Sequence, residues 1–311
     1  MKIAIYGVGG VGGYFGGRLA QAGHDTVFIA RGAHLDAMRR DGLQVSSPKG
    51  DFVVPLDSCT ATDDAAGVGV VDLILLGVKA GQVSDVAPAM VSMVGPGTVV
   101  VPLQNGVEAA GDLVSALGPS PVLGGLCRIV SSIAGPGRIA HAGLEPTIVM
   151  GELDRSSSER VERVRHGLAE AGITVEIPDD IHVALWQKLL MIGPWGGLGA
   201  MTRVTLDALC DTTETRTLLH QAMSEVHALA AAHEVHLPAD AVEKTIAFLA
   251  GLPPGGTASM QRDIMKGRPS ELESQIGVVV RLGPEKGVDT TVHSFVYESL
   301  LPGETIARTT N

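Results

Sequence analysis

The chain has 311 residues, of which 45% are hydrophobic and 18% are charged, and its formal net charge is −11 at pH 7. This length predicts two domains that can each bury a core, and the acidic balance argues against a nucleic-acid-binding surface. The three cysteines (Cys59, Cys127 and Cys210) are odd in number and lack the spacing of metal ligands, so we expect buried thiols in a reducing compartment and no metal site. The chain begins directly in a strand and has no apolar run of about 18 residues, which predicts a cytoplasmic protein without a signal peptide or membrane span.

The first dozen residues predict a dinucleotide-binding loop. A short β-branched strand at residues 1–6 precedes a glycine-rich run, and an apolar-periodic helix follows at residues 14–22. The run consists of Gly7, Val8, Gly9, Gly10, Val11 and Gly12. Its glycines fit G-x-G-x-x-G, in which the first permits a tight turn, the second lets the backbone approach a pyrophosphate and the third lets helix and strand pack closely. Because a strand precedes the motif and a helix follows it, we interpret the loop as a cofactor site and not as a purely structural turn.

Basic side chains follow two further strands. Arg31 comes after the strand at residues 26–30, at the position where an NAD-binding site usually carries Asp or Glu for the ribose 2′-hydroxyl. A cation there would bind a 2′-phosphate, which favours NADPH. Lys79 follows the apolar strand at residues 72–78, at the edge where open α/β sheets bind ligands. We therefore expect Arg31 and Lys79 to bind one phosphate; the alternative is two ordinary surface cations.

An amide follows the strand at residues 98–103, in the sequence Gln104-Asn105-Gly106. Asn-Gly is mostly a turn signal. At the carboxyl end of a sheet strand, however, the Asn105 amide would also reach nicotinamide or substrate. The residues alone leave both interpretations open.

The pattern changes from strands to helices near Asp179. Residues 122–150 predict several short strands with glycine turns, followed by a helix at 159–171 and a strand at 174–177. The expected helices of the second half lie at residues 181–192, 218–230, 238–251, 260–265 and 271–282, the last stopped by Gly283-Pro284. The sequence thus predicts an α/β fold, with an N-terminal Rossmann-type doubly wound parallel sheet that binds NADP (1–179). An all-helical domain for substrate binding and dimerisation follows (180–311).

Several motifs in this order resemble the ketopantoate reductase (2-dehydropantoate 2-reductase) family over essentially the whole chain. They are the glycine loop, Lys79-Ala80, Gln104-Asn105-Gly106, Trp186-x-Lys188, and Ser259-Met260 followed twelve residues later by Glu271. The resemblance implies NADPH-dependent reduction of a 2-oxo acid to a 2-hydroxy acid, a place in pantothenate biosynthesis, and a homodimer as the assembly to test for.

The resemblance also implies roles for single residues. Lys188 would be the general acid and Glu271 would hold the substrate hydroxyl. Ser259 would bind the substrate carboxylate, and Asn105 would lie near the nicotinamide. The chemistry is consistent, because hydride addition to a 2-oxo carbon leaves an alkoxide that an ammonium can stabilise and protonate. Without the resemblance, Lys188 reads as a solvated helix lysine and Glu271 as part of a surface ion pair.

One departure concerns the substrate. Family members that reduce ketopantoate usually carry asparagines four and eight residues after the lysine, and here these positions are Ile192 and Gly196. The loss of two amides predicts an apolar, glycine-rich pocket wall and a more apolar 2-oxo acid. The alternatives are a repacked helix with an unchanged substrate, a dehydrogenase of the β-hydroxyacid kind, or a catalytically silent NADP-binding sensor. Ile192 speaks against the β-hydroxyacid reading, because that class commonly has an asparagine or aspartate at this position.

Overall fold

The computed structural model describes residues 1–310, apart from the side chain of Leu144. The chain forms two compact units. The first unit comprises Met1–Gln104 and Glu108–Ile181, and the second comprises the short segment Asn105–Val107 and the chain from His182 onward. Each unit has a hydrophobic core of its own.

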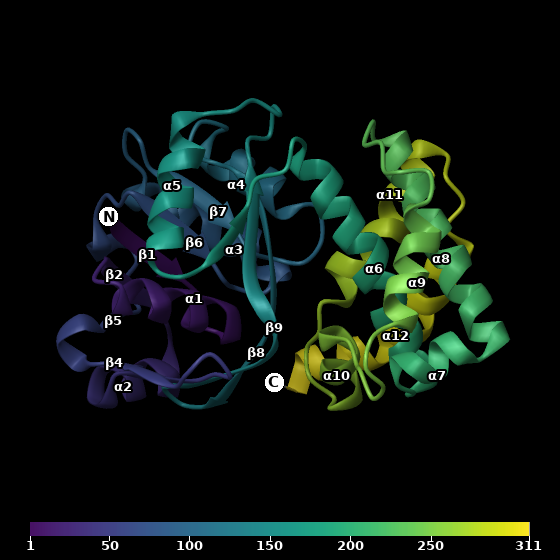
Figure 1. Cartoon of the computed structure of the whole chain (residues 1–311), viewed down its shortest axis with the longest axis horizontal. Coiled ribbons are helices and arrows are strands. Elements are labelled where there is room, and N and C mark those ends of the chain that lie inside the picture. Colours follow the sequence, from purple (N-terminus) through teal and green to yellow (C-terminus); the bar gives the residue numbers. More distant parts are fainter. Residues whose placement is uncertain (311) are drawn as a thin grey trace. The chain divides into compact units, whose positions relative to one another are not determined.

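The first unit contains a five-stranded parallel sheet in the order β5-β2-β1-β6-β7 (Figure 1). The strands are β1 (Lys2–Tyr6), β2 (Asp25–Ile29), β5 (Thr60–Thr62), β6 (Leu73–Leu76) and β7 (Val99–Pro102). The strand order turns back on itself at β1, so the carboxyl ends of β1 and β6 form the switch point at which such sheets bind dinucleotides. The predicted Rossmann-type fold is therefore confirmed.

Alternate residues of β1 point into two different cores, as the pleat of a strand requires. Ile3 and Ile5 lie in the core shared with Phe15 of the first helix, whereas Ala4 and Tyr6 lie in the core on the other face. The first face is covered by α1 (Gly10–Gln21), α2 (Gly32–Asp41) and α5 (Glu159–Glu170), and the second by α3 (Val83–Val86), the 3₁₀ segment Ala87–Met93 and α4 (Ala109–Leu117). Helices on both faces explain why the strands are apolar throughout.

A second sheet packs in the same unit, and the sequence did not predict its form. Its path is β10-β9-β3-β4, with β8 paired to β9. The strands are β3 (Leu43–Ser46), β4 (Phe52–Val54), β8 (Gly124–Gly135), β9 (Arg138–Gly151) and β10 (Thr174–Glu176). Residues 122–150 thus form one long hairpin, drawn in teal in Figure 1, and not several short strands. The glycines of this segment do not divide it into short strands: Gly125 lies inside β8, where a Cβ would lie 2.5 Å from the Pro102 carbonyl oxygen.

The second unit is helical, as predicted. Its elements are α6 (Ile181–Thr202, whose first residue belongs to the first unit), α7 (Leu206–Asp211), α8 (Thr213–Ala232), α9 (Ala241–Ala250), α10 (Ser259–Met265), a π-helical turn (Glu273–Gly277), α11 (Val278–Lys286) and α12 (Thr291–Thr310). Two predicted helix ends were wrong: α6 continues through Pro194 to Thr202, and α11 passes Gly283-Pro284 and ends at Lys286. Tertiary packing explains both, because it outweighs the low helix propensity of glycine and proline. The last helix, α12, was not predicted.

Two expectations from composition can be compared with the structure. The three cysteines are free and buried, as predicted, and burial raises the pKa of the Cys59 thiol to about 11. Within residues 1–310, none of the helices combines the length and the apolar character that crossing a membrane requires.

Candidate active site

The glycine loop lies between β1 and α1, and its three motif glycines meet different surroundings. Gly7 has φ +94°, a left-handed conformation that a side chain would strain. A Cβ on Gly12 would lie only 2.1 Å from the Gly7 carbonyl oxygen, so this glycine permits close packing of helix and strand. By contrast, the nearest atom to a Cβ on Gly9 is the Gly77 carbonyl oxygen at 3.9 Å. The loop therefore has open space at the position where the motif requires a backbone approach to a pyrophosphate.

The N-terminus of α1 is suited to an anion. Gly9 is the N-cap and supplies no side-chain hydrogen bond, and the first turn carries no acidic residue. The first N–H groups of a helix lack partners within it, and they carry the positive end of the helix dipole. A phosphate at this end of α1 would meet unpaired N–H donors.

Arg31 and Lys79 lie beyond the strands that flank β1. Arg31 is the N-cap residue of α2, two residues after β2, and its side chain is exposed. Lys79 is also exposed and follows β6. Because β2 and β6 pair with β1 on opposite sides, the two backbones are separated by about two strand spacings, or roughly 10 Å. Long cationic side chains can converge over such a distance.

Gln104 is a residue at this edge that the sequence analysis did not select. It is 5% exposed, and its Nε2 donates to the carbonyl oxygens of Leu76 (2.9 Å) and Val78 (3.0 Å). These bonds tie the end of β7 to the end of β6, next to the glycine loop. Its position within Gln-Asn-Gly after a buried strand was the signal that could have identified it.

In the helical unit, α6 carries Lys188 and Ile192 one turn apart, and both side chains are partly buried. Residues four apart lie on the same face of a helix. Trp186 is 5% exposed and packs in the core of this unit, with its ring centroid 5.6 Å from that of His233. The buried Trp186 thus fixes the rotation of α6 about its axis and, with it, the direction of the face that carries Lys188.

Glu271 is the centre of a buried hydrogen-bond cluster in the same unit. Asn105 Nδ2 donates to Glu271 Oε2 over 2.7 Å, and Gln275 Nε2 donates to the same oxygen over 3.0 Å. The Glu271 side chain is 9% exposed and Gln275 is 1% exposed. The sequence left open whether Asn105 was only a turn residue; its amide binds a carboxylate. Gln275 was missed, because nothing in the sequence marks a glutamine four residues after a glutamate as a ligand of that glutamate.

The segment that carries Asn105 is held against the π-helical turn by a second contact. Gly106 has φ +98°, and a Cβ there would lie 2.7 Å from the Ser274 carbonyl oxygen. Glycine at position 106 therefore lets the Asn105 segment approach Ser274 closely enough for the Asn105–Glu271 bond.

Gly196 does not line an open wall as expected. A Cβ at this position would lie 2.9 Å from Met260 Cε and 3.5 Å from Ala258 Cβ, so Met260 fills the space that a larger residue would use. Ser259, the first residue of α10, is exposed beside the buried Met260. Of the two positions without asparagine, only Ile192 retains a partly exposed side chain.

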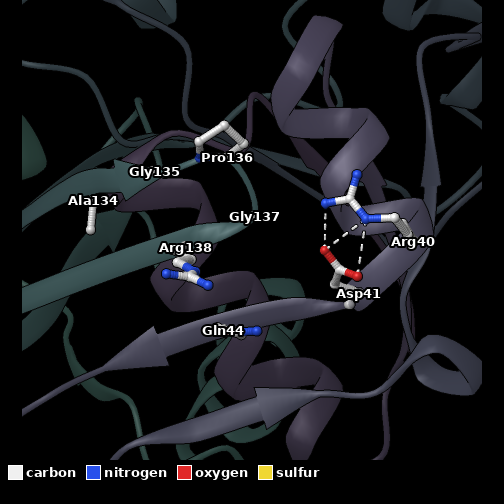
Figure 2. Close-up of a pocket in the computed structure, with 9 residues that line it drawn as sticks. Arg40, Asp41, Gln44, Ala134, Gly135, Pro136, Gly137 and Arg138 are labelled. Carbon is white, nitrogen blue, oxygen red and sulfur yellow. Dashed lines mark hydrogen bonds and ion pairs between the residues drawn. The ribbon is translucent and has the colours of Figure 1, made fainter.

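A hollow of about 290 Å³ in the first unit lies apart from the residues predicted to bind the cofactor (Figure 2). It lies at the C-terminal end of α2, whereas Arg31 caps the N-terminal end. Arg40 is paired with Asp41 through three contacts of 2.6 to 3.1 Å, and this pairing lowers the pKa of the Asp41 carboxyl. Arg138 lies across the hollow, at the start of β9. Asp41 balances the Arg40 charge, and the charge of Arg138 also lowers the pKa of the Asp41 carboxyl.

Comparison with known proteins agrees with the two-part architecture. Residues 3–155 match the family model described as ketopantoate reductase PanE/ApbA, and residues 180–303 match its C-terminal counterpart. This chain belongs to the ketopantoate reductase family. The names of the family and of its members indicate an oxidoreductase.

Individual relatives span the full length of the chain. A 2-dehydropantoate 2-reductase from Nostoc is 30% identical over 304 residues, covering 96% of this chain and 94% of the relative. The crystal structure of a PanE/ApbA-family ketopantoate reductase from Ralstonia eutropha superposes with a TM-score of 0.90 at 30% identity, covering 99% of this chain and 100% of the other. D-mandelate dehydrogenase, solved with NADH and anilino(oxo)acetate, shares the fold with a TM-score of 0.88 at 23% identity, covering 99% of each chain.

The structure groups the predicted site residues of this ketopantoate reductase family member into two sets. The glycine loop, Arg31 and Lys79 belong to the first unit, and Asn105, Lys188, Ser259 and Glu271 belong to the second. Asn105 and Glu271 are joined directly by a hydrogen bond.

Proposed function

We propose that the chain catalyses the NADPH-dependent reduction of a 2-oxo acid to a 2-hydroxy acid, with Lys188 as general acid. The observation that carries this proposal is the buried Glu271 carboxylate, held by Asn105 in the unit whose helix α6 bears Lys188. Burial of a charged carboxylate is costly unless it is hydrogen-bonded, so a carboxylate with so little exposure indicates a functional role. We assign it the binding of the hydroxyl of the 2-hydroxy acid.

The residues of the first unit fit a bound NADPH. The open space at Gly9 and the uncapped N-terminus of α1 would receive the pyrophosphate, and Arg31 with Lys79 would bind the 2′-phosphate. When bound, NADPH supplies the hydride. We assign residues 1–179 to cofactor binding and residues 180–311 to substrate binding and dimerisation, in a cytoplasmic enzyme.

The residues of the second unit would stabilise the negative charge that develops on the substrate oxygen and supply the proton that neutralises it. As the carbonyl oxygen of the substrate becomes an alkoxide, the Lys188 ammonium stabilises it and donates a proton from Nζ. Once that proton is transferred, Glu271 accepts a hydrogen bond from the hydroxyl formed at the reacting carbon, and Ser259, exposed at the start of α10, binds the substrate carboxylate. Asn105 would lie near the nicotinamide, and its amide orients Glu271.

A more apolar substrate than ketopantoate is favoured by two observations. Ile192 presents a partly exposed aliphatic side chain one turn from Lys188, and Met260 fills the space beside Gly196. Neither position offers a hydrogen bond to a hydroxyl on the substrate tail. An NADP-binding sensor without turnover is the rival function, and the presence of Lys188 and Glu271 argues against it.

The decisive experiment measures NADPH consumption by the purified protein with a panel of 2-oxo acids that includes ketopantoate and 2-oxoisovalerate. We expect turnover with at least one of them, and a kcat lower by about 10²-fold or more in a matched Lys188→Ala protein that still binds NADPH. Tight NADPH binding without turnover across the panel would establish the sensor function instead. Light scattering of the same preparation determines whether the protein is a homodimer.

A further inference from the structure

We propose that Gln275 is a positioning residue for Glu271, which fixes the carboxylate so that Oε1 remains as the acceptor for the hydroxyl of the 2-hydroxy acid. The inference rests on the proposed function. It assigns a role to a residue that touches neither substrate nor cofactor and acts through Glu271 alone.

The hydrogen bonds of Glu271 are unequally divided between its two oxygens. Oε2 accepts from Asn105 Nδ2 (2.7 Å) and from Gln275 Nε2 (3.0 Å), whereas within residues 1–310 no protein donor meets Oε1. A carboxylate only accepts hydrogen bonds, so the amide nitrogen of Gln275 must be the atom that faces it. Two donors on one oxygen oppose rotation of the carboxylate, and the accepting capacity of Oε1 is kept for a ligand.

Burial makes the second donor effective. Gln275 is 1% exposed, so water does not compete for its amide. Hydrogen bonds to a charged group are about twice as strong as neutral ones, and weak screening in the interior adds to this. The hydrogen bond from Gln275 therefore restricts the orientation of the Glu271 carboxylate, and water cannot replace it as it could at the surface.

The backbone of Gln275 is anchored on the helix that carries the proposed acid. A Cβ on Gly193 of α6 would lie 2.8 Å from the Gln275 carbonyl oxygen, so only glycine permits this approach. Gln275 lies within the π-helical turn Glu273–Gly277, and its N–H donates to the Glu271 carbonyl oxygen over 3.1 Å. Single π-turns in helices occur frequently at functional sites. The backbone of Gln275 thus contacts α6, which bears Lys188, while its side-chain amide binds the carboxylate of Glu271.

The test compares Gln275→Met with Gln261→Met. Methionine keeps the length of glutamine and removes the donor. Gln261 is a matched control because it is fully buried in the same unit, but its side chain binds only backbone groups: Nε2 donates to the carbonyl oxygens of Gly199 and Val204, and Oε1 accepts from the Ala258 N–H. We expect Gln275→Met to lower kcat by about tenfold to a hundredfold, since slight misplacement of a catalytic group has effects of that size, while KM changes less than about threefold. Gln261→Met should lower the melting temperature but leave kcat within about threefold of wild type.

A spectroscopic readout separates positioning from general loosening. The carboxylate band of Glu271 is isolated by the infrared difference between wild type and Glu271→Gln, and it responds to hydrogen bonds on the carboxylate. It should shift in Gln275→Met and stay unchanged in Gln261→Met. Equal loss of kcat in both variants, or an unshifted band in Gln275→Met, would overturn the positioning role.

The outcomes also distinguish this inference from the proposed function. A wild-type protein without turnover on any 2-oxo acid would refute the proposed function, and the positioning role with it. An active wild type together with an equally active Gln275→Met protein would refute the positioning role alone.

Discussion

Two alanine substitutions in the glycine loop should have different effects: Gly12→Ala should lower the stability of the fold, and Gly9→Ala should weaken cofactor binding. In Gly12→Ala the new methyl carbon would lie 2.1 Å from the Gly7 carbonyl oxygen, where ordinary contacts are 3.4–4 Å, so backbone must move by more than 1 Å. Overpacking of this kind costs about 3 kcal/mol at the upper end of its usual range, and the better helix propensity of alanine offsets about 1 kcal/mol. The remaining 2 kcal/mol or so corresponds to a melting temperature about 4–8 °C lower for a unit of this size.

Gly9→Ala is the matched partner, because its methyl carbon would have no neighbour closer than 3.9 Å and Gly9 already has φ −81°. We expect less than about 1 kcal/mol of destabilisation, from a poorer N-cap, but at least about tenfold weaker NADPH binding, since the methyl group occupies the path of the pyrophosphate. Thermal unfolding without cofactor and titration calorimetry with NADPH measure the two quantities. The reasoning fails if Gly12→Ala melts like wild type, or if Gly9→Ala binds NADPH with unchanged affinity.

Three further predictions concern the proposed chemistry. Arg31→Asp should weaken NADPH far more than NADH in binding titrations, because an anion would then face the 2′-phosphate; equal weakening of both would remove the phosphate role. Lys188→Ala should lower kcat by about 10²-fold or more with nearly unchanged NADPH affinity, and retained turnover would place the acid elsewhere. In kcat/KM, 2-oxoisovalerate should exceed ketopantoate, whose tail hydroxyl would lose about 1–3 kcal/mol without a partner at Ile192 or Gly196. A tenfold preference for ketopantoate would show that other groups bind that hydroxyl.

The parts of the fold that sequence predicted are those specified by local signals. The strand, glycine loop and helix at the N-terminus follow from residues that are neighbours along the chain, and the apolar runs of β6 and β7 identify buried strands without further information. The helical second half was likewise recognised from its periodicity. In each case the side chains that determine the element lie within it.

The parts that sequence missed depend on contacts between distant residues. Gly125 lies inside a strand because the Pro102 carbonyl oxygen lies against it, and α6 runs through Pro194 because other elements of the helical unit pack on it. Gln275 and Glu271 are four residues apart in the sequence, but the second donor to the same carboxylate oxygen is Asn105, 166 residues away from Glu271. Hydrophobic periodicity and secondary-structure propensity depend on neighbouring residues, so they cannot predict such distant contacts.

The glycines of the chain show that the spacing of glycines alone does not reveal whether a position is open to a ligand or packed against another element. Gly9 and Gly196 both read as open positions in the sequence, one for a cofactor and one in a substrate wall. A Cβ on Gly9 would meet open space, whereas on Gly193, Gly196, Gly197 and Gly199 it would lie 2.7–2.9 Å from atoms of other elements. The glycine run of α6 therefore serves close packing against α10, α12 and the π-helical turn, whereas the loop glycine leaves room for a ligand. Substrate choice must then depend on the side chains that α6 still presents, above all Ile192, and on the Met260 side chain that occupies the space beside Gly196.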